Sequence, residues 1–452
     1  MTQFAPLFDL ARVIGAPLDL LPTHCYSSLV SQITTDSRDL EKDALFVALP
    51  GDRFDGHDFV ARAIAQGCLA AVVQRHRWEA SAELASLPCL PVADTLAAYQ
   101  SLGQWWRQQQ RATIVAVTGS VGKTTTKELI AAALGTQGKV LKTQANYNNE
   151  IGVPKTLLQL QPDHRFAVIE MGMRGPGEIA LLARIANPDV AVITNVGTAH
   201  IGRLGSEQAI AAAKCELLTQ LSPQGIAILN YDNHRLMDTA QGVWSGRTLS
   251  FGLEGGDIRG EWLDDHTLMV QDIPLPLPLP GRHNALNFLA AIAVLTALEL
   301  DWSGLSQGFQ VDLPTGRARQ ITLPDDIVLL DETYNAGFES MTAALQLLAQ
   351  TPGQRHIAVL GTMKELGDYS LDLHHRIGTT VKQLGIDRLL ILADAAEAAA
   401  LTQGCDGVES ETFADHPALI EALQATLQPG DRVLFKASRS VGLDQVVTAL
   451  IA

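Results

Sequence analysis

Short apolar runs alternate with helix-spaced segments along most of the chain. In the middle these runs are TIVAV, FAVIEM, VAVITN and GIAILN, and after residue 314 they are IVLLD, IAVLG, RLLILA and RVLFK. Strands buried on both faces are apolar throughout, and their alternation with helices is typical of a parallel sheet covered by helices. We therefore predict an α/β protein with two such sheets, the second of them Rossmann-like.

The chain divides into three units, as its 452 residues suggest at roughly 150 residues a domain. The first unit contains shorter strand-like runs, ITTDSR, ALFVALPG and AAVVQ, with one helix-spaced segment among them. A polar, Gln-rich helix beginning at Thr95 leads away from this unit, and we expect Trp105 and Trp106 on it to pack between domains. The predicted domains cover residues 1–105, 106–313 and 314–452.

An alternation of proline and leucine marks the end of the middle unit. It runs from Ile273 to Pro280. Such a segment cannot form a central strand, because proline has no backbone N–H to donate to a neighbouring strand. We predict an edge strand or an extended connector there, followed by a helix that begins near His283.

Charge and cysteine content exclude several classes of protein. The chain has 33 Lys and Arg against 49 Asp and Glu, a net charge of −16, whereas a free-standing nucleic-acid binder shows the opposite balance. Its five cysteines form no CxxC pair, which argues against a disulfide framework or a zinc ribbon. No signal peptide and no apolar stretch of about 18 residues is evident. We expect a cytoplasmic protein without nucleic-acid binding or membrane insertion.

A phosphate-binding loop follows the strand TIVAV. In TGSVGKTTTKELIAAAL, Gly119 and Gly122 let the backbone turn so that successive N–H groups point into one concavity. Lys123 would then reach the outer phosphates, and the Thr124 hydroxyl would reach Mg²⁺. The longer form of this pattern has glycine where Val117 stands. We predict a nucleoside triphosphate site made by Gly119, Ser120, Val121, Gly122, Lys123, Thr124 and Thr125.

Two side chains at neighbouring strand ends are candidates for the same site. A nucleotide site needs an acid that organises its metal ion, and FAVIEMG ends in Glu170, which we expect to bind the metal or to position water. The next strand runs into NVGTAH and brings His200 to the same edge of the sheet. Taken singly, a strand-end glutamate is more often solvated and a lone histidine more often structural.

Several segments resemble, in the same order, the motifs of the Mur ligases, the ATP-dependent amide-bond ligases of bacterial cell-wall precursor synthesis. They are TGSVGKTTTKE, TQANYNNEIGVPKTLLQL, IEMG, NPDVAVITNVGTAH, AAKCELL and GRHNALN. The resemblance covers essentially the whole chain. It implies a small N-terminal α/β domain that binds a UDP-sugar, a central P-loop ATPase domain with a mainly parallel sheet, and a C-terminal Rossmann-like domain that binds the acceptor and closes over ATP.

One segment distinguishes branches within that family. LLDETYNAGFESM, residues 329–341, resembles the dipeptide-adding branch, which carries Asp-Asp-(Ser/Thr)-Tyr-Asn-Ala-Asn-Pro there. Glu332 replaces the second Asp, and Gly337-Phe338 replaces Asn-Pro. The resemblance implies an ATP-dependent ligase that joins D-alanyl-D-alanine to UDP-N-acetylmuramoyl-tripeptide through an acyl phosphate, which makes the pentapeptide precursor of peptidoglycan. It also implies a monomer.

The resemblance further implies roles for the central residues. Lys123 would cradle the β- and γ-phosphates of ATP, while Thr124 and Glu170 would hold one Mg²⁺. His200 would hold a second Mg²⁺ between the γ-phosphate and the incoming acyl oxygens. Lys214, in AAKCELL, stands where several family members carry a carbamylated lysine, whose negative charge could support the second metal. An unmodified Lys214 that pairs with Glu216 or with phosphate remains an alternative to carbamylation.

Other candidates are residues that the resemblance predicts to contact the substrates. For the nucleotide, the family's base, phosphate and ribose contacts correspond to Asn287, Arg317, Asp331 and Asn335. For the UDP-muramoyl-peptide and the dipeptide, the candidates are Ser37, Arg38, Asn146, Asn148, Asn149, Lys364 and Arg439. Ser37 and Arg38 could instead form a surface turn, and the three asparagines could only shape a tight loop.

Three other functions remain open. A ligase of the same superfamily that adds a single amino acid would keep the ATP site and change only the acceptors. A P-loop switch whose nucleotide state controls a partner would share the glycine-rich loop alone. A non-catalytic scaffold would have no need of a complete set of phosphate and metal residues.

Overall fold

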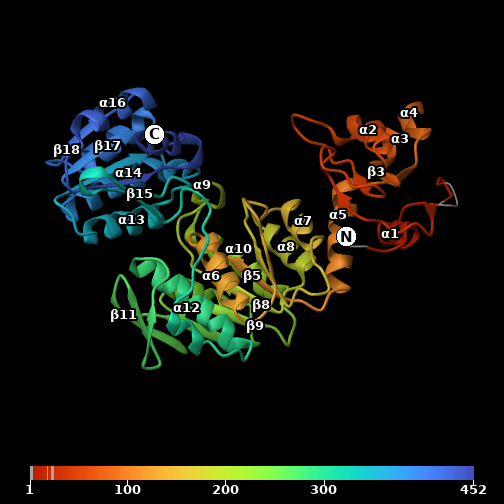
Figure 1. Ribbon diagram of the computed structural model, residues 1–452, viewed down its shortest axis with the longest axis horizontal. Coiled ribbons are helices and arrows are strands. Elements are labelled where there is room, and N and C mark those ends of the chain that lie inside the picture. The colour runs from red at the N-terminus through yellow and green to blue at the C-terminus, as the bar shows by residue number, and fades with distance from the viewer. Residues whose placement is uncertain (1–3, 18, 22–24, 452) are drawn as a thin grey trace.

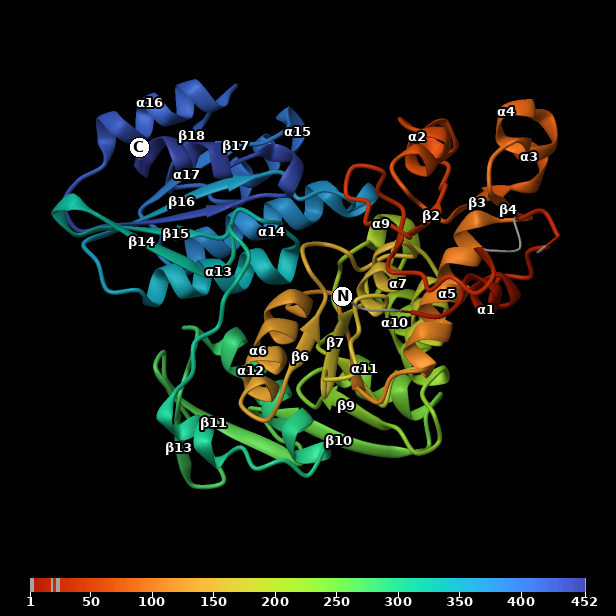
Figure 2. The same cartoon turned by 45° about the vertical axis from the view of Figure 1, so that its right-hand side comes forward.

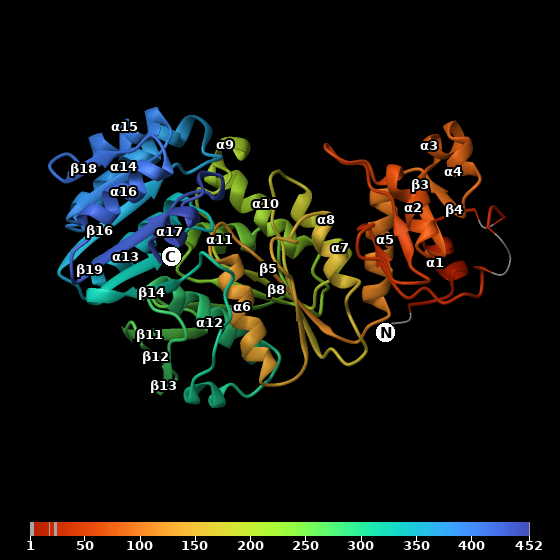
Figure 3. The same ribbon diagram turned by 45° about the horizontal axis from the view of Figure 1, so that its top comes forward.

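The computed structural model describes residues 4–17, 19–21 and 25–451. Three α/β units follow one another along the chain, and the N-terminal and C-terminal units lie at opposite ends of the molecule with the central unit between them (Figure 1, Figure 3). Each unit has its own sheet, of four, nine and six strands. The predicted α/β class and the three-unit organisation are therefore confirmed.

The N-terminal unit is a four-stranded parallel sheet in the order β1-β2-β3-β4. Three of these strands lie in the predicted runs, and the fourth was not predicted. The strands are β1 (Ile33–Thr34), β2 (Leu45–Val47), β3 (Ala70–Gln74) and β4 (Cys89–Val92). The helices are α1 (Leu7–Val13), η2 (Gly56–Phe59), α2 (Val60–Ala65), α3 (Arg75–Ala80) and α4 (Ala82–Ala85).

Helix α5 (Thr95–Gln108) joins the first unit to the second, as its polar pattern predicted. The Asp94 side chain caps it by accepting hydrogen bonds from two backbone N–H groups. Trp106 is buried between the units: its ring lies 4.4 Å from that of Phe4, and its Nε1 donates to the Leu160 carbonyl at 3.0 Å. The boundary suggested at residue 105 falls inside this continuous helix and remains a proposal, as does the one at residue 313.

The central sheet has nine strands in the order β13-β12-β11-β10-β9-β8-β5-β7-β6. Those from β6 to β11 pair in parallel, and β11 to β13 pair antiparallel. The strands are β5 (Thr113–Thr118), β6 (Val140–Lys142), β7 (Phe166–Glu170), β8 (Val190–Ile193), β9 (Ile226–Asn230), β10 (Arg247–Gly252), β11 (Ile258–Asp264), β12 (Thr267–Val270) and β13 (Ile273–Pro276). The helices are α6 (Lys123–Gly135), α7 (Gly152–Leu157), α8 (Glu178–Ala186), α9 (Ile201–Leu204), α10 (Glu207–Thr219), α11 (His234–Gln241) and α12 (Arg282–Ala297).

The Pro-Leu segment forms the edge strand β13, which confirms that prediction. β13 pairs only with β12, so its prolines need no donor on the open side. The next helix, α12, begins at Arg282. It packs against α6, and both helices contribute buried side chains to one core cluster with strands β5 and β7 to β12.

The C-terminal unit is a six-stranded sheet in the order β14-β15-β19-β16-β17-β18. The four predicted apolar runs form its four central strands, while the polar edge strands β14 and β18 were missed. The strands are β14 (Arg319–Leu323), β15 (Ile327–Asp331), β16 (Arg355–Gly361), β17 (Arg388–Leu392), β18 (Glu409–Thr412) and β19 (Asp431–Lys436). The helices are η4 (Pro324–Asp326), α13 (Phe338–Gln350), η5 (Gly367–Tyr369), α14 (Ser370–Gln383), α15 (Ala395–Gly404), α16 (His416–Thr426), η6 (Arg439–Val441) and α17 (Asp444–Ile451). The short helix η3 (Ser303–Gln307) precedes this unit and packs against β13 of the central sheet.

The carboxyl ends of strands from two sheets face the same space. An extended connection passes α12 and leads into β14 (Figure 2). It brings the loops after β15, β16 and β19 opposite the loops after β5, β7 and β8, and one cavity is lined by all of them. This is where open α/β sheets bind ligands. Within the described ranges, no helix combines the length and apolar character that a membrane span requires.

Candidate active site

A cavity of about 810 Å³ lies between the central and C-terminal units. Most of the predicted site residues line it. They are Ser120, Val121, Gly122, Lys123, Thr124, Thr125, Asn146, Asn148, Asn149, Glu170, His200, Asn287, Arg317, Asn335, Lys364 and Arg439. Residues from sequence positions more than 300 apart therefore share one site.

The phosphate loop occupies the turn from β5 into α6. Gly122 is the N-cap of α6 with φ +80°, a left-handed conformation that favours glycine. Lys123 begins the helix, and its Nζ donates to the carbonyls of Gly119 at 2.8 Å and Ser120 at 3.3 Å. Burial lowers the pKa of Lys123, and the nearby Arg317 guanidinium acts in the same direction. The N–H groups of this helix end and the Lys123 ammonium form an anion site.

The segment after β8 holds the phosphate loop in shape. Asn195 Oδ1 accepts from the Val121 N–H and Asn195 Nδ2 donates to the Val121 carbonyl, both at 3.0 Å. The Asn195 carbonyl also accepts from the Ser120 N–H at 3.0 Å, and Thr194 Oγ1 donates to the Val121 carbonyl at 2.7 Å. Asn195 was not singled out from the sequence, although it stands in the quoted motif NVGTAH.

Glu170 reaches the cavity at the end of β7 with one carboxylate oxygen free. Its Oε1 accepts from Asn148 Nδ2 at 2.8 Å, while its buried Oε2 has no hydrogen-bond partner among the residues that the structure describes. The Glu170 backbone N–H donates to Thr143 Oγ1 at 3.0 Å, which fixes the end of the strand. A buried carboxylate oxygen without a partner fits a metal ligand, because such an atom is otherwise costly.

A buried charge network stands behind Glu170. Lys127 is fully buried, and its Nζ lies 4.0 Å from Glu170 Oε2. The same ammonium donates to the Thr143 carbonyl at 2.7 Å and pairs with Glu128 at 2.9 Å, and Glu128 in turn pairs with Lys142 at 2.5 Å. The sequence signal for Lys127 was its position four residues after Lys123, on the same side of α6.

His200 lies at the boundary with the C-terminal unit. It has φ +67° and caps the short helix α9. Its Nδ1 lies 2.6 Å from Glu365 Oε2, and the nearby histidine and Arg203 hold the pKa of Glu365 below its usual range. This carboxylate was missed, since nothing in the local sequence joins positions 200 and 365.

Lys214 is buried on α10, with 1% of its surface exposed. Burial lowers the pKa of its amine well below the ordinary value, and the Lys123 cation acts in the same direction. The alternative pairing of Lys214 with Glu216 is wrong: Glu216 instead accepts from the backbone N–H groups of Gly177 and Ala180 at the start of α8. An anion at this helix end is favourable.

The nucleotide candidates differ in how freely they face the cavity. Arg317 stacks over the Tyr334 ring at 4.0 Å, and its Nε has no hydrogen-bond partner. Asn287 is held by the Thr126 hydroxyl at 3.0 Å, beside Gly122. Asp331 is buried, accepts from the Thr333 hydroxyl at 2.6 Å, and is not among the residues that line the cavity.

The acceptor candidates are cations already paired within the C-terminal unit. Lys364 pairs with Asp394, and Arg439 Nη1 lies 3.4 Å from Asp444. Lys436, which the sequence analysis did not single out, lies 3.5 Å from Glu332 and donates to the Asn335 carbonyl at 3.2 Å. Burial lowers the pKa of Lys436.

The three asparagines have separate tasks. Asn148 orients Glu170, as described above, and Asn146 lines the cavity. Asn149 Oδ1 accepts from the backbone N–H groups of Ile151 and Gly152 at 3.3 and 2.9 Å, so it shapes the start of α7. Asn149 therefore shapes the loop and Asn148 contacts Glu170, while all three asparagines line the cavity.

Ser37 and Arg38 lie in the N-terminal unit and do not line the cavity. Arg38 is exposed and pairs with Asp36 at 2.7 Å, which lowers the pKa of Asp36 to about 2. Lys155 of the central unit adds to this effect, so the turn faces α7. The Lys155 ammonium lies 4.2 Å above the Tyr147 ring. The central unit therefore places one cation opposite Arg38 of the N-terminal unit.

A Mg²⁺ site would draw on few protein ligands. Among the described residues, no group of three or more His, Cys, Asp or Glu side chains is arranged to hold a metal. Mg²⁺ keeps several waters and usually takes one or two carboxylates together with substrate phosphates. The free oxygen of Glu170, beside the phosphate loop, fits that pattern.

Comparison with known proteins agrees with this arrangement. Three family models match the chain: the Mur ligase family catalytic domain at residues 29–102, the Mur ligase middle domain at 117–295, and the Mur ligase glutamate ligase domain at 316–439. The UDP-N-acetylmuramoyl-tripeptide–D-alanyl-D-alanine ligase of Synechocystis is 54% identical, over 100% of this chain and 99% of the relative. The ligase of the same name from Escherichia coli is 39% identical, over 92% and 93%.

Solved structures of MurF proteins have the same fold as this chain. A crystal structure of MurF from Acinetobacter baumannii has a TM-score of 0.88 at 33% identity and covers 100% of this chain and 99% of that one. MurF from Thermotoga maritima in complex with ADP has a TM-score of 0.81 at 29% identity and covers 92% and 96%. The chain belongs to the Mur ligase family, and within it to the branch of the UDP-N-acetylmuramoyl-tripeptide–D-alanyl-D-alanine ligases.

Proposed function

We infer that this chain joins D-alanyl-D-alanine to UDP-N-acetylmuramoyl-tripeptide at the expense of ATP and so makes the UDP-linked pentapeptide for peptidoglycan synthesis. The observation that carries this function is a cavity with a phosphate loop on one wall and cations of the C-terminal unit on the other. The full-length relatives that bear this activity in their names support the same substrates.

The first step is a phosphoryl transfer. The terminal carboxylate of the tripeptide attacks the γ-phosphorus of ATP, an acyl phosphate forms, and ADP leaves with the electron pair of the broken P–O bond. Such a reaction depends on positioning and on neutralising charge. In our proposal Lys123 and the N-terminal N–H groups of α6 bind the β- and γ-phosphates.

The second step is acyl transfer. The free amine of D-alanyl-D-alanine attacks the activated carbonyl, loses a proton, and displaces inorganic phosphate as the amide bond forms. Water must be kept from the acyl phosphate, and a cavity divided between two units can exclude it by closing. Lys364 and Arg439 are our candidates for the dipeptide carboxylate, supported by their place on the C-terminal wall.

Magnesium completes the proposed site. It would neutralise phosphate charge when bound, and we assign Thr124 and Glu170 to one ion and His200 to a second. The free Glu170 oxygen supports the first assignment, and the exposure of His200 to the same cavity supports the second.

Carbamylation of Lys214 belongs to the same proposal. Burial favours the neutral form of the Lys214 amine, and a neutral amine can add to carbon dioxide and lose a proton to give a carbamate. The expected mark is a carbamate carbon signal in the NMR spectrum of the folded protein in bicarbonate labelled with carbon-13. A Lys214→Arg variant should lose it.

The remaining contacts complete the assignment. We assign Asn287, Arg317, Asp331 and Asn335 to the nucleotide, Asn146, Asn148 and Asn149 to the muramoyl-peptide, and Ser37 and Arg38 to its uridine diphosphate. The three domains carry these tasks in chain order: residues 1–105, 106–313 and 314–452. We also infer a cytoplasmic protein, supported by five buried cysteines without disulfides among the described residues and by the use of ATP, and a monomer, by likeness to the family.

Phosphate release tests the function directly. The purified protein is given ATP and Mg²⁺, then UDP-muramoyl-tripeptide, then D-alanyl-D-alanine. Release that requires both acceptors and prefers the dipeptide over D-alanine, L-lysine, diaminopimelate or glutamate is the expected result. Release that follows a single amino acid instead would overturn the acceptor, and release indifferent to every acceptor would overturn the ligase function.

A further inference from the structure

The segment from Thr194 to Thr198 connects the phosphate loop to the C-terminal unit. At its start, Thr194 and Asn195 hold Ser120 and Val121 through the hydrogen bonds described above. In its middle, the Gly197 N–H donates to Ser120 Oγ at 2.9 Å. We call residues 194–198 the relay segment.

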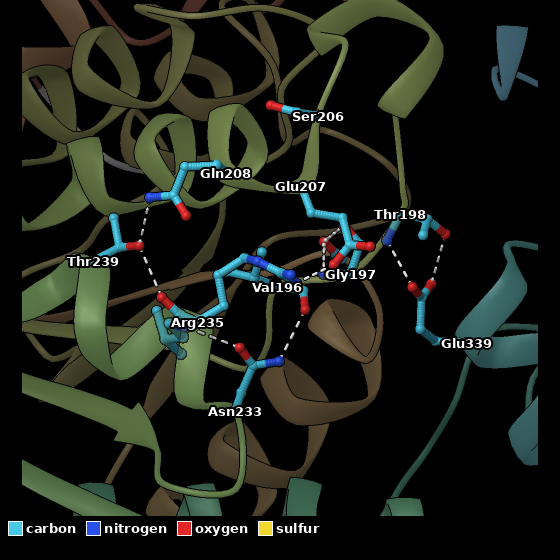
Figure 4. A network of polar contacts seen from close by, with 12 residues as sticks. Val196, Gly197, Thr198, Ser206, Glu207, Gln208, Asn233, Arg235, Thr239 and Glu339 are labelled. Atoms are coloured by element: carbon cyan, nitrogen blue, oxygen red, sulfur yellow. Dashed lines mark hydrogen bonds and ion pairs between the residues drawn. The ribbon is translucent and has the colours of Figure 1, made fainter. Parts of the chain in front are cut away.

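The far end of the relay segment is held by Glu339 of α13. The Glu339 carboxylate accepts from the Thr198 N–H at 2.6 Å and from the Thr198 hydroxyl at 3.2 Å. Figure 4 shows Glu339 reaching from the C-terminal unit toward Thr198. A Cβ at Gly197 would collide with this carboxylate, so glycine allows the close approach. Hydrogen bonds to an ionised group are among the stronger ones in proteins.

The relay segment is also anchored to the central unit through two of its carbonyl groups. Asn233 Nδ2 donates to the Val196 carbonyl at 2.8 Å (Figure 4). Asn230 Nδ2 donates to the Thr194 carbonyl, also at 2.8 Å. These bonds hold Thr194 and Val196 in place, so the residues that Glu339 can displace are Gly197 and Thr198. A shift of Thr198 is therefore expected to reach Ser120, through Gly197.

Glu339 lies in the first turn of α13, but its carboxylate does not cap that helix. The N-terminus of α13 is capped by Ser340, whose Oγ accepts from the Gly337 N–H at 3.1 Å. Phe338 packs under the Arg376 guanidinium at 4.3 Å. The Glu339 carboxylate thus bonds to the central unit, and its removal leaves the hydrogen bond between Gly337 and Ser340 of α13 in place.

We propose that Glu339 is a positioning residue that couples docking of the C-terminal unit to the geometry of the phosphate loop, through Thr198 and the relay segment. This inference rests on the proposed function only in requiring ATP at the phosphate loop. Because coupling between two sites is reciprocal, nucleotide binding strengthens docking, and docking strengthens nucleotide binding by the same factor.

The test uses a non-hydrolysable ATP analogue with Mg²⁺ and two readouts, neither of which is catalysis. The affinity for the analogue is measured by calorimetry. The separation of the two units is measured between spin labels on Gln241→Cys and Gln383→Cys, both exposed positions, and the five native cysteines are buried and will not compete for label. The variants are Glu339→Ala, Glu339→Gln and Thr198→Val, and the control is the exposed Glu421→Ala on α16.

In the parent protein and in Glu421→Ala, the analogue should narrow the distribution of label distances. In Glu339→Ala, affinity should fall about tenfold and the distances should no longer respond, and Glu339→Gln and Thr198→Val should lie between. The coupling would be overturned if folded Glu339→Ala and Glu339→Gln bound the analogue as tightly as the parent protein and showed the same change in label distances. Failure of the parent protein to bind the analogue would count against the proposed function instead.

Discussion

The two walls of the cavity are built from different interactions. The phosphate-loop wall is held by backbone and amide hydrogen bonds, chiefly those of Asn195, which fix the course of the loop backbone before any ligand arrives. The C-terminal wall offers Lys364, Arg439 and Lys436, each with a nearby acid of its own unit. The backbone of the first wall is therefore preorganised and only Lys123 there must leave its own partners, whereas each cation of the second wall must exchange partners to receive a carboxylate.

The sharpest test of the preorganised wall is Lys123→Met. This change keeps the length of the side chain and removes the charge that faces the outer phosphates. We expect kcat/KM for ATP to fall by about a thousandfold, the range found when an electrostatic contact to a transition state is lost. Steady-state phosphate release measures it, with the exposed Lys382→Met as a control. A loss below tenfold would contradict the assigned role.

Lys127→Met tests whether the buried charges behind Glu170 belong to the same wall. Removing one partner from a buried ionic network leaves a charge uncompensated, which costs about 3 kcal/mol of unfolding free energy. Here Glu170 would lose its nearest buried cation. Urea unfolding of the variant and the parent gives the difference. Equal urea midpoints in Lys127→Met and the parent would contradict a contribution of this network to stability.

The exchange of partners on the C-terminal wall is tested by Arg439→Ala. If Arg439 leaves Asp444 to bind the dipeptide, KM for D-alanyl-D-alanine should rise about tenfold, since a charged hydrogen bond is worth roughly 1.5–3 kcal/mol. KM for ATP should change far less. Asp444→Asn should instead lower KM for D-alanyl-D-alanine, because it frees Arg439 from its ion pair. A rise in KM for ATP alone would move Arg439 to the nucleotide.

The smallest effect is expected at the exposed Asp36–Arg38 pair. The pKa of folded Asp36 is about 2, below the roughly 3.9 of an unfolded aspartate. The pair therefore stabilises the fold above about pH 4, and this contribution is lost as pH falls toward 2. Because the pair is solvated, the effect is small. The stability difference between the parent and Asp36→Asn, measured by urea unfolding, should shrink to nothing between pH 4 and 2.

Local sequence determined the strands and the phosphate loop. The apolar runs formed the central strands of both large sheets because strands buried on two faces need apolar side chains throughout. Gly122 and Lys123 lie in the predicted turn because the conformation there depends on residues adjacent in the chain. The polar edge strands β14 and β18 escaped prediction, since half-solvated edges carry no such pattern.

Only the tertiary structure decided how distant groups meet. Glu339 contacts Thr198, Glu365 contacts His200, and Asn195 clamps Val121, although their separations in sequence range from 74 to 165 residues. These contacts depend on where two sheets direct their strand ends, which no local spacing encodes. The sequence thus determined which residues carry charge and which segments turn, and the packing of three units decided which of those charges face one another.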